Sequence, residues 1–374
     1  MIKRKFVHMK IIKFVKRNPD VNLLRILKSR VYDHFKEKNI PLTGTWRSYL
    51  PAGLMIFLFF VLLLLPYIRD ASPRSHYVYA GILGAIIGFI GFMVGHTASH
   101  GSFSKNKEVN ELLSYSFDLF SGVSSFFWKI KHEVVHHTYT NIYEFDDDIE
   151  TGGVFRFSPL QKWYPWHLVQ IVYMLPFYAF LHFQWIFIKD FQKLYQMKVG
   201  QTEIKKIGFA DIFIILGGKI IHVLLFMVLP YVVFGFEEML RAYVCMICTT
   251  GLIITIIFQL AHVQRKSIFL KPDQATGNIK NDWIIVQILS TANFGQDSYW
   301  VRLLTGGLSN QIEHHAFPDI NPEHYPIVSE IMINFCKEFK LPYNRYDTIA
   351  EGFVDHSIHV IEMSFKPKQT VLNS

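Results

Sequence analysis

Three histidines fall close together in the stretch WKIKHEVVHHTYTN, which runs from Trp128 to Asn141: His132, His136 and His137. A hydrophobic core has no use for three adjacent imidazoles, whereas a metal ion does. Three further groups of the same kind occur in the chain. They are His96 and His100 in GHTASHG, His262 in FQLAHV, and Gln311, His314 and His315 in NQIEHH. One structural zinc site uses four ligands, so this set is too large for it.

The spacing within these groups matches one face of a helix. Residues three or four apart share a helix face, so His96 and His100 can bind one metal ion, and so can His132 and His136. His137 is turned by about 100° from His136 and can reach a neighbouring ion. Gln311, His314 and His315 repeat this arrangement at i, i+3 and i+4. Two HxxxH pairs and two HH pairs therefore favour two metal ions over one.

Histidine ligands also predict which other residues should lie nearby. Imidazole suits zinc, copper, iron and nickel, and soluble di-iron proteins combine glutamates with Glu-x-x-His pairs. Neutral ligands leave more positive charge on the metals, so we expect carboxylates to accept hydrogen bonds from the ring N–H groups. The candidates are Glu133, Glu313 and the acidic run Asp146–Asp148, with Asp147 and Asp148 foremost. A solvated loop is the alternative interpretation of that run.

Long apolar segments must position these groups. Hydrophobic residues make up 51% of the 374 residues, 18% are charged and the mean hydropathy is +0.21, whereas soluble domains carry about 25% charged residues. A membrane helix needs roughly 20 apolar residues. Four segments meet that requirement: 52–68, 78–95, 212–236 and 242–261. We predict an all-α integral membrane protein, with four transmembrane helices in two hairpins and a cytoplasmic helical cap that holds the di-metal centre.

The distribution of charge orients these spans. Residues 1–49 carry 13 lysines and arginines against three acids. A basic flank before a first span indicates a cytoplasmic N-terminus, and we set nucleic-acid binding aside because an apolar run follows at once. The second and fourth spans then return to the cytoplasmic side, where His96 and His262 emerge together. A single crossing by a fifth apolar segment, 165–188, would separate the histidine groups, so we predict that it lies in the interface or re-enters.

These features divide the chain into a basic cytoplasmic segment (1–49), a membrane domain (50–365) and a short tail (366–374). No cleavable signal is evident.

Two other patterns concern packing. Glycines at 84/88 and 91/95 form GxxxG pairs, which predict a close-packed seam between helices. The CxxC of Cys245 and Cys248 lies in an uncharged run, and we interpret it as two small residues of a buried helix. We expect His222 to be a hydrogen-bonded polar group of a span.

The histidine groups resemble the boxes of the membrane fatty acid desaturase family. HxxxH (His96–His100), HxxxHH (His132–His137) and QxxHH (Gln311–His315) occur in that order, with hairpins between them. Glutamine at the start of the third box marks the front-end group, which includes linoleoyl-CoA or Δ6-type and sphingolipid desaturases. KHEVVHHTYTNIYEFDDDIE and GGLSNQIEHHAFPDINPEHYP are similar to its bacterial branch. The resemblance covers roughly Val78 to Phe365.

The resemblance implies an oxygen-dependent acyl desaturase that holds two irons and no haem. Gln311 would either ligate iron through its oxygen or only form a hydrogen bond, beside the ligands His96, His100, His132, His136, His137, His262, His314 and His315. The chain departs from its relatives at Thr97, where they have Asp, and at Glu133, where they have Asn; both changes bear on substrate choice and redox tuning. A hydroxylase or ketolase on the same centre is the alternative, and a non-catalytic scaffold with a structural metal is a remote one.

The expected partners follow from the same comparison of motifs. Many front-end enzymes carry a fused cytochrome b5 domain with a His-Pro-Gly-Gly motif, which does not occur in this sequence. We therefore expect a separate electron donor, either a ferredoxin or a cytochrome b5-type protein with its reductase, and the basic first segment can steer an acidic donor. The substrate is expected to be an acyl-CoA or an acyl lipid in the bilayer. A bacterial inner membrane is favoured, with the endoplasmic reticulum as the alternative.

Overall fold

A computed structural model describes residues 7–8, 11–16, 18–68 and 73–366. Five helices in it are long and apolar enough to cross a membrane: Trp46–Ile68, Ser75–Ser99, Pro165–Gln196, Phe209–Phe234 and Phe236–His262. The predicted spans 52–68, 78–95 and 242–261 lie within the first, second and fifth of these helices. The predicted span 212–236 lies in the fourth helix, Phe209–Phe234, and extends two residues beyond its end. That helix stops at Phe234 because Gly235 takes a positive φ of 85°, and the next helix begins at Phe236.

Several of the long helices change their pitch along their length. The single-piece helices are α2 (Trp46–Ile68) and α12 (Phe236–His262). Three helices are composite. The first joins α3 (Pro73–Ile90), the π-helical turn η2 (Gly91–His96) and α4 (Thr97–Ser99). The second joins η5 (Pro165–Val169), α8 (Gln170–Gln184), the π-helical turn η6 (Trp185–Lys189) and α9 (Asp190–Gln196), and the third joins α10 (Phe209–Val223), the π-helical turn η7 (Leu224–Val228) and α11 (Leu229–Phe234).

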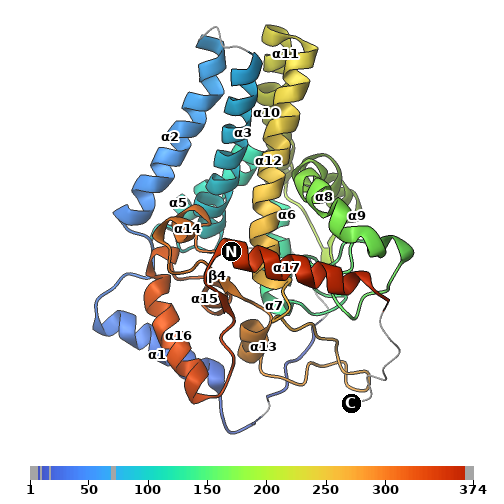
Figure 1. The fold of residues 1–374 in the computed structure, drawn as a ribbon. Helices are drawn as coiled ribbons and strands as arrows, with labels where there is room; N and C mark the ends of the chain where they lie inside the picture. Colours follow the sequence, from blue (N-terminus) through green and yellow to red (C-terminus); the bar gives the residue numbers. More distant parts are fainter. Residues whose placement is uncertain (1–6, 9–10, 17, 69–72, 367–374) are drawn as a thin grey trace.

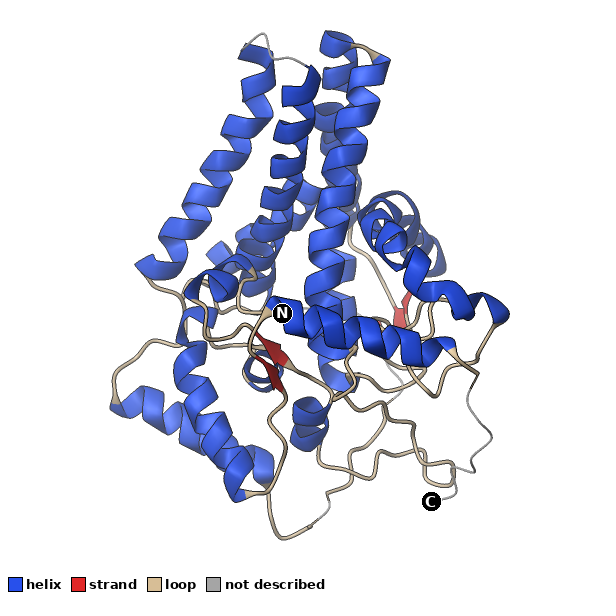
Figure 2. Ribbon diagram, viewed as in Figure 1, coloured by secondary structure: helices blue, strands red, loops and turns tan. Residues whose placement is uncertain are grey.

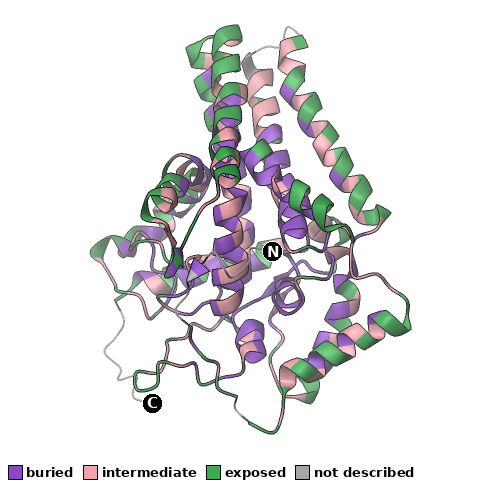
Figure 3. Ribbon diagram, turned by 180° about the vertical axis from the view of Figure 1, so that it is seen from behind, coloured by how far each residue is buried: buried purple, intermediate pink, exposed green. Residues whose placement is uncertain are grey.

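The helices α2, α3, α10, α11 and α12 rise together in the upper half of the molecule, above a broader lower part (Figure 1). Exposed residues cover the upper ends of these helices, and buried residues gather lower down, where they enter the lower part (Figure 3). Many exposed side chains of the upper half are large and apolar, including Leu54, Phe57 and Leu64 of α2 and Val232 of α11. Such an outward apolar surface suits a lipid environment.

The remaining helices are short and complete the lower part. They are α1 (Leu23–Glu37), α5 (Lys107–Ser114), η3 (Phe117–Ser121), α6 (Ser125–Lys129), η4 (Ile130–His136), α7 (His137–Tyr139), α13 (Trp283–Leu289), α14 (Tyr299–Leu304), α15 (Gln311–Ala316), η8 (Pro322–His324), α16 (Tyr325–Glu338) and α17 (Ile349–Ser364). The basic first segment contributes α1, whose buried residues Leu27, Val31 and Phe35 share a hydrophobic cluster with α16. Of the predicted tail 366–374, all but residue 366 lies outside the described residues.

Two small sheets depart from the all-α prediction (Figure 2). In the first, β3 (Thr202–Ile204) lies between β1 (Val7–His8) and β2 (Lys198–Val199), antiparallel to both. In the second, β4 (Asn293–Phe294) pairs with β5 (Arg345–Tyr346) in parallel. Strands of two or three residues are too short to show the alternating pattern by which a strand is recognised in a sequence.

The predicted glycine seam packs α3 against α12. A Cβ atom at Gly84 would collide with the carbonyl oxygen of Met246, and one at Gly88 would lie 3.1 Å from Cγ2 of Ile253. A Cβ atom at Gly251, on the same helix α12, would collide with the backbone of Ala179 in α8. Small residues therefore let three helices approach one another closely, as the GxxxG spacing predicted for the first pair.

The segment Pro165–Gln196 is long and apolar enough to cross a membrane by itself, so its placement in the interface stays a prediction. Its orientation favours that prediction. Figure 1 looks nearly along the axis of α8, whereas α2, α3 and α12 run up the page. A helix that lies across the bundle in this way does not add a crossing parallel to the other four.

Candidate metal centre

The eight histidines predicted as ligands converge in one place, although they come from four separate regions. His96 is the last residue of η2, and His100 follows α4. His262 is the last residue of α12. The other five are His132 and His136 on η4, His137 on α7, and His314 and His315 on α15. All of them are buried apart from His100, which is half-buried.

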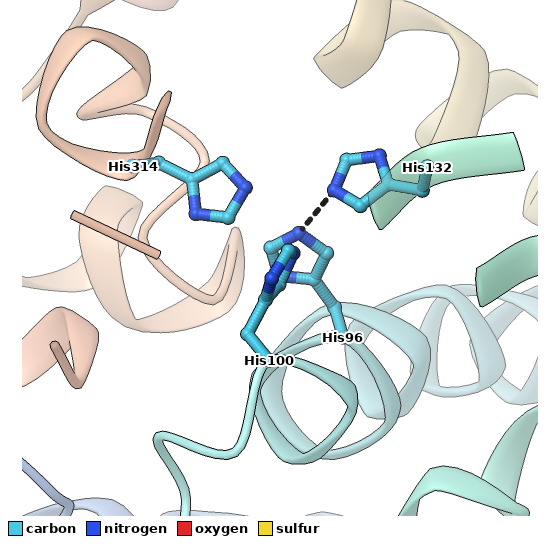
Figure 4. A group of neighbouring side chains, drawn as sticks. All are labelled: His96, His100, His132 and His314. Atoms are coloured by element: carbon cyan, nitrogen blue, oxygen red, sulfur yellow. Dashed lines mark hydrogen bonds between the residues drawn. The ribbon is translucent and has the colours of Figure 1, made fainter. Parts of the chain in front are cut away.

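The first group consists of His96, His100, His132 and His314, whose nearest ligand atoms all lie within 4.8 Å of one another. Their rings point towards a common centre (Figure 4). The Nε2 atoms of His96 and His132 are 3.0 Å apart, and the Nε2 atoms of His132 and His137 are 3.1 Å apart. His137 therefore lies at the edge of this group.

The second group consists of His136, His262 and His315. The Nε2 atoms of His136 and His262 are 3.2 Å apart. The side-chain amide nitrogen of Gln311 lies 2.8 Å from Nε2 of His262, so the glutamine of the third box belongs here. The rings of His137 and His315 stack at 4.4 Å between centroids, which places the two groups side by side.

The division of the second box between the groups differs from the prediction. We expected His132 and His136 to share one ion and His137 to reach its neighbour, but His132 lies with His137 and His136 lies in the other group. The reason is the π-helical turn η4 (Ile130–His136), in which residues five apart come into line because the turn is wider. His132 and His136 share a third possible group only together with Asp148.

Unpaired buried nitrogens support metal binding at both groups. The Nε2 atoms of His100, His314 and His315 and the amide oxygen of Gln311 are buried without a hydrogen-bond partner, and such groups are rare in folded proteins. Two nitrogens that bind one ion at about 2.1 Å lie roughly 3.0–3.4 Å from each other, which matches the measured Nε2 separations. The residues present therefore fit two metal ions, each bound through Nε2.

Three of the opposite ring nitrogens, those of His136, His314 and His315, are held from outside the cluster, whereas Nδ1 of His96 and of His137 is buried without a partner. The carboxylate of Asp146 accepts a hydrogen bond from Nδ1 of His136 at 3.0 Å, and Asp148 lies 3.1 Å from the same atom. His314 bonds the hydroxyl of Tyr325 at 3.2 Å, and His315 bonds the amide oxygen of Gln287 at 2.8 Å. These contacts fix the ring orientations and leave Nε2 directed inwards.

Of the five carboxylates predicted for this task, Asp146 and Asp148 reach a histidine of the cluster, and the other three do not. Asp147 lies 3.8 Å from Nζ of Lys131. Glu313 is buried, but it accepts hydrogen bonds from Tyr343 and Asn293 at 2.6 and 2.8 Å, because β4 and the segment before β5 cover its side of α15. One carboxylate oxygen of Glu133 is buried without a hydrogen-bond partner; burial raises the pKa of this group to about 7, and the charge of Lys129 opposes that rise.

Gln287 and Tyr325 were missed from the sequence because each is a common residue type, distant from the box that it contacts. Asp146 belonged to the predicted acidic run but was not placed foremost. The turn at Asn141, which has a positive φ of 56°, brings Asp146 back to His136. Asn141 also donates its backbone N–H to the carboxylate of Asp146 at 2.8 Å.

The electrostatics of the cluster keep most ligands neutral. Burial, together with the neighbouring imidazoles, lowers the pKa of His132, His137, His314 and His315 well below the usual value. Burial acts in the same direction on His136, but Asp146 and Asp148 outweigh it and raise the pKa of that ring. Neutral imidazole is the form that binds metals, so the protein holds the ligands ready for that role.

Two further histidines and the cysteines of the CxxC pair lie apart from the centre. His222 bonds the hydroxyl of Tyr243 at 3.0 Å, which confirms the prediction of a hydrogen-bonded polar group. His182 bonds the carbonyl oxygen of Ser121 at 3.0 Å. Cys245 and Cys248 are free, half-buried thiols on α12, consistent with their interpretation as packing residues.

A cavity of about 270 Å³ opens beside both histidine groups. His132 of the first group and His262 of the second group lie in its wall. One part of the wall is aromatic, with Trp128, Phe155, Phe157, Phe177, Tyr178, Trp185 and Phe258, and charged and amide side chains line the rest. This shape and lining suit a long apolar chain that lies against the cluster.

Comparison with known proteins agrees with this chemistry. A family model described as fatty acid desaturase matches residues 73–347. The sn-1 linoleoyl-lipid 6-desaturase of Synechocystis is 32% identical over 337 residues, which cover 89% of this chain and 92% of that protein. The protein of the same name from Arthrospira platensis is 31% identical over 290 residues, 77% of each chain. The acyl-lipid (8-3)-desaturase of Physcomitrium patens is 30% identical over 341 residues, 90% of this chain and 70% of its own.

Proposed function

The chain belongs to the fatty acid desaturase family, and from this premise we propose that it desaturates the acyl chains of membrane lipids with two iron ions held by its histidine cluster. It is a fatty acyl desaturase, an oxidoreductase of lipid metabolism. The observation that carries the proposal is the convergence of eight imidazoles in two groups, with one member of each group, His132 and His262, in the wall of a cavity. The names of the similar proteins, which refer to linoleoyl lipids and acyl lipids, support the substrate class.

Each ion has a set of ligands in this proposal. His96, His100, His132, His137 and His314 hold one ion, and His136, His262, His315 and Gln311 hold the other. When bound, the irons supply reductive activation of O2, with electrons from a separate protein, so that two hydrogens leave adjacent methylenes and water is formed. Gln311 would serve through its amide oxygen, which is buried without a partner.

The side chains of the cavity position the acyl chain and exclude water. Trp128 stacks on His132 with 4.5 Å between the ring centroids, so an aromatic face borders the first group. Trp185 and Phe258 continue that apolar wall. Methylene groups that bind there are desolvated and held beside the ligands, and such positioning contributes a large part of catalysis when reacting atoms are fixed in contact.

The bilayer is the medium for this reaction. The five apolar helices and their exposed apolar side chains support an integral membrane protein. We place the N-terminus and the metal centre on the cytoplasmic side, in a bacterial inner membrane, because of the 13 basic residues among the first 49. The segment Pro165–Gln196 then lies at the cytoplasmic interface, and a ferredoxin or a cytochrome b5-type protein approaches from that side.

The test is expression in a host with a known fatty acid profile, followed by mass spectrometry of derivatised double bonds. His136→Ala should abolish the new double bond, because it removes a ligand of the second group. His34→Ala, a change on α1 away from the cluster, should leave the product intact. A hydroxylated or keto product in place of the double bond would overturn the proposal in favour of the alternative reaction.

Iron analysis of the same purified proteins separates two kinds of failure. Two irons per wild-type chain without product would point to a missing electron donor, and added ferredoxin with its reductase should then restore activity. A well-folded wild-type chain that binds no iron under reducing, iron-replete conditions would refute the di-iron centre.

A further inference from the structure

The helix that lines the cavity beside the histidine groups changes its character along its length. Between Phe177 and Trp185, the side chains that face the cavity are mainly apolar. From residue 189 onwards they are polar or cationic. The members of this second stretch are Lys189, Gln192, Lys193 and Gln196. Their spacing of three and four residues places them on one face of α9 and of the turn before it.

The cavity therefore matches an amphiphile in a defined orientation. Its apolar stretch adjoins Trp185 and the histidine cluster, where the acyl chain would react. Its polar stretch lies further along the same helix, so the head group of a lipid that enters this cavity would lie at α9. Lys198 and the loop around Gly200 also border this end.

The charges at the polar end favour an anion. Lys131 is already paired with Asp148 at 2.8 Å and lies 3.8 Å from Asp147. Among the described residues, no carboxylate oxygen lies within 4.0 Å of the ammonium groups of Lys189, Lys193 or Lys198. Glu150 is the one remaining acid in the lining, so the unpaired cations outnumber the unpaired acids.

Phosphate is the head-group chemistry that suits these residues. A phosphate accepts hydrogen bonds from ammonium and amide N–H groups at the same time, whereas a neutral sugar leaves lysines without a counter-charge. We propose that Lys189 and Lys193, together with Gln192 and Gln196, bind the phosphate of a phospholipid and so select phosphate-bearing acyl donors. This inference rests on the proposed function, because it assigns the head group of the substrate of that same cavity.

Competition between two head groups tests the proposal. The purified, iron-loaded chain is placed in nanodiscs with equal amounts of phosphatidylglycerol and monogalactosyldiacylglycerol that carry the same acyl chains. Ferredoxin with its reductase supplies electrons in the presence of O2, and the new double bonds are counted in each lipid class. A lysine near a membrane surface contributes about fivefold in binding. Lys189→Gln with Lys193→Gln should therefore reduce the preference for the phospholipid by roughly 25-fold.

The matched control is Lys205→Gln with Lys206→Gln. These lysines are exposed and lie after β3, outside the cavity lining, so the control removes the same charge without touching the site. Its preference should equal that of the wild type. Equal conversion of both lipids by the wild type, or the same loss of preference in both double variants, would overturn the proposal in favour of general attraction to an anionic surface.

Two further arms complete the design. An acyl-CoA with the same acyl chain, supplied alone, reports whether a soluble phosphate donor is used; faster conversion of it than of the phospholipid would reject the lipid as the source of the phosphate. Quenching of tryptophan fluorescence by brominated versions of the two lipids, taken as the difference between the wild type and Trp185→Phe, measures binding without turnover at the cavity that Trp185 lines. The difference removes the signal of tryptophans exposed elsewhere, such as Trp46 and Trp166. If no double bond forms in any arm although both irons and the electron donor are present, the proposed function fails, and the quenching comparison still decides the head-group proposal.

Discussion

Asp146→Asn is expected to weaken iron binding at the second histidine group. The carboxylate accepts a hydrogen bond from Nδ1 of His136, with its two oxygens at 3.0 and 3.1 Å. Loss of a carboxylate that orients a metal-binding histidine lowers metal affinity by about 10–100-fold. Asp148 lies 3.1 Å from the same nitrogen and can replace part of the interaction, so we expect a value near the lower end, about tenfold.

The same substitution should also destabilise the fold, for a reason visible in the hydrogen bonds. One oxygen of Asp146 accepts the backbone N–H of Asn141 at 2.8 Å, and the other accepts that of Asp148 at 3.0 Å. An asparagine has one oxygen and one NH2 group, so in either orientation one buried N–H faces another donor. An unsatisfied donor of this kind costs about 1–3 kcal/mol.

The assay is iron content by mass spectrometry after equilibration with a series of chelator concentrations, together with thermal unfolding in detergent. Asp146→Asn should lose one iron before the other, and at about tenfold less chelator than the wild type requires. Asp147→Asn is the matched control, since that neighbouring carboxylate approaches Lys131; it should retain both irons. A folded Asp146→Asn protein with the iron retention of the wild type would refute the role assigned to this carboxylate.

Three more changes test the packing and the buried charges by thermal unfolding of the purified chain. Gly84→Ala should destabilise the protein by about 1–3 kcal/mol, because its Cβ would collide with α12, whereas Gly217→Ala, with open space around it, should be neutral. Lys219→Met should cost about 3–5 kcal/mol, since it strands the buried Asp190 that it pairs with at 2.8 Å; a double change with Asp190→Asn should recover most of that loss. Burial raises the pKa of Asp118 from 3.8 to about 7, so the folded state binds the proton more tightly and this residue lowers stability as pH rises from about 4 to 7. Asp118→Asn should therefore stabilise the chain by about 2–4 kcal/mol at pH 8 and by clearly less at pH 5; an equal gain at both values would contradict the assignment.

The sequence allowed the meeting of the ligands to be predicted because two independent constraints agreed. The apolar runs placed His96 and His262 at the ends of helices, and the charge distribution put those ends on one side. Neither constraint depends on details of side-chain packing. The four predicted spans are confirmed as long apolar helices for the same reason, since their length and composition determine them.

The assignment of each ligand to a group was not predictable in the same way. It depends on the number of residues per turn in η4, and a sequence does not state whether a turn is α- or π-helical. His137, rather than His136, therefore lies in the same group as His132. The contacts of Tyr325 and Gln287 depend on how α15 packs against α16 and α13, which no local pattern encodes.

The glycine seam connects the packing of the membrane helices to the chemistry. α3 leads through η2 to His96 of the first group, and α12 ends at His262 of the second group. The close approach at Gly84 and Gly88 fixes how far one helix is displaced along the other. A slip by one helical turn would move one ligand by about 5.4 Å, which exceeds the 4.8 Å within which the atoms of each group lie. The relative position of His96 and His262 is thus constrained by the close contacts that Gly84 and Gly88 allow between α3 and α12.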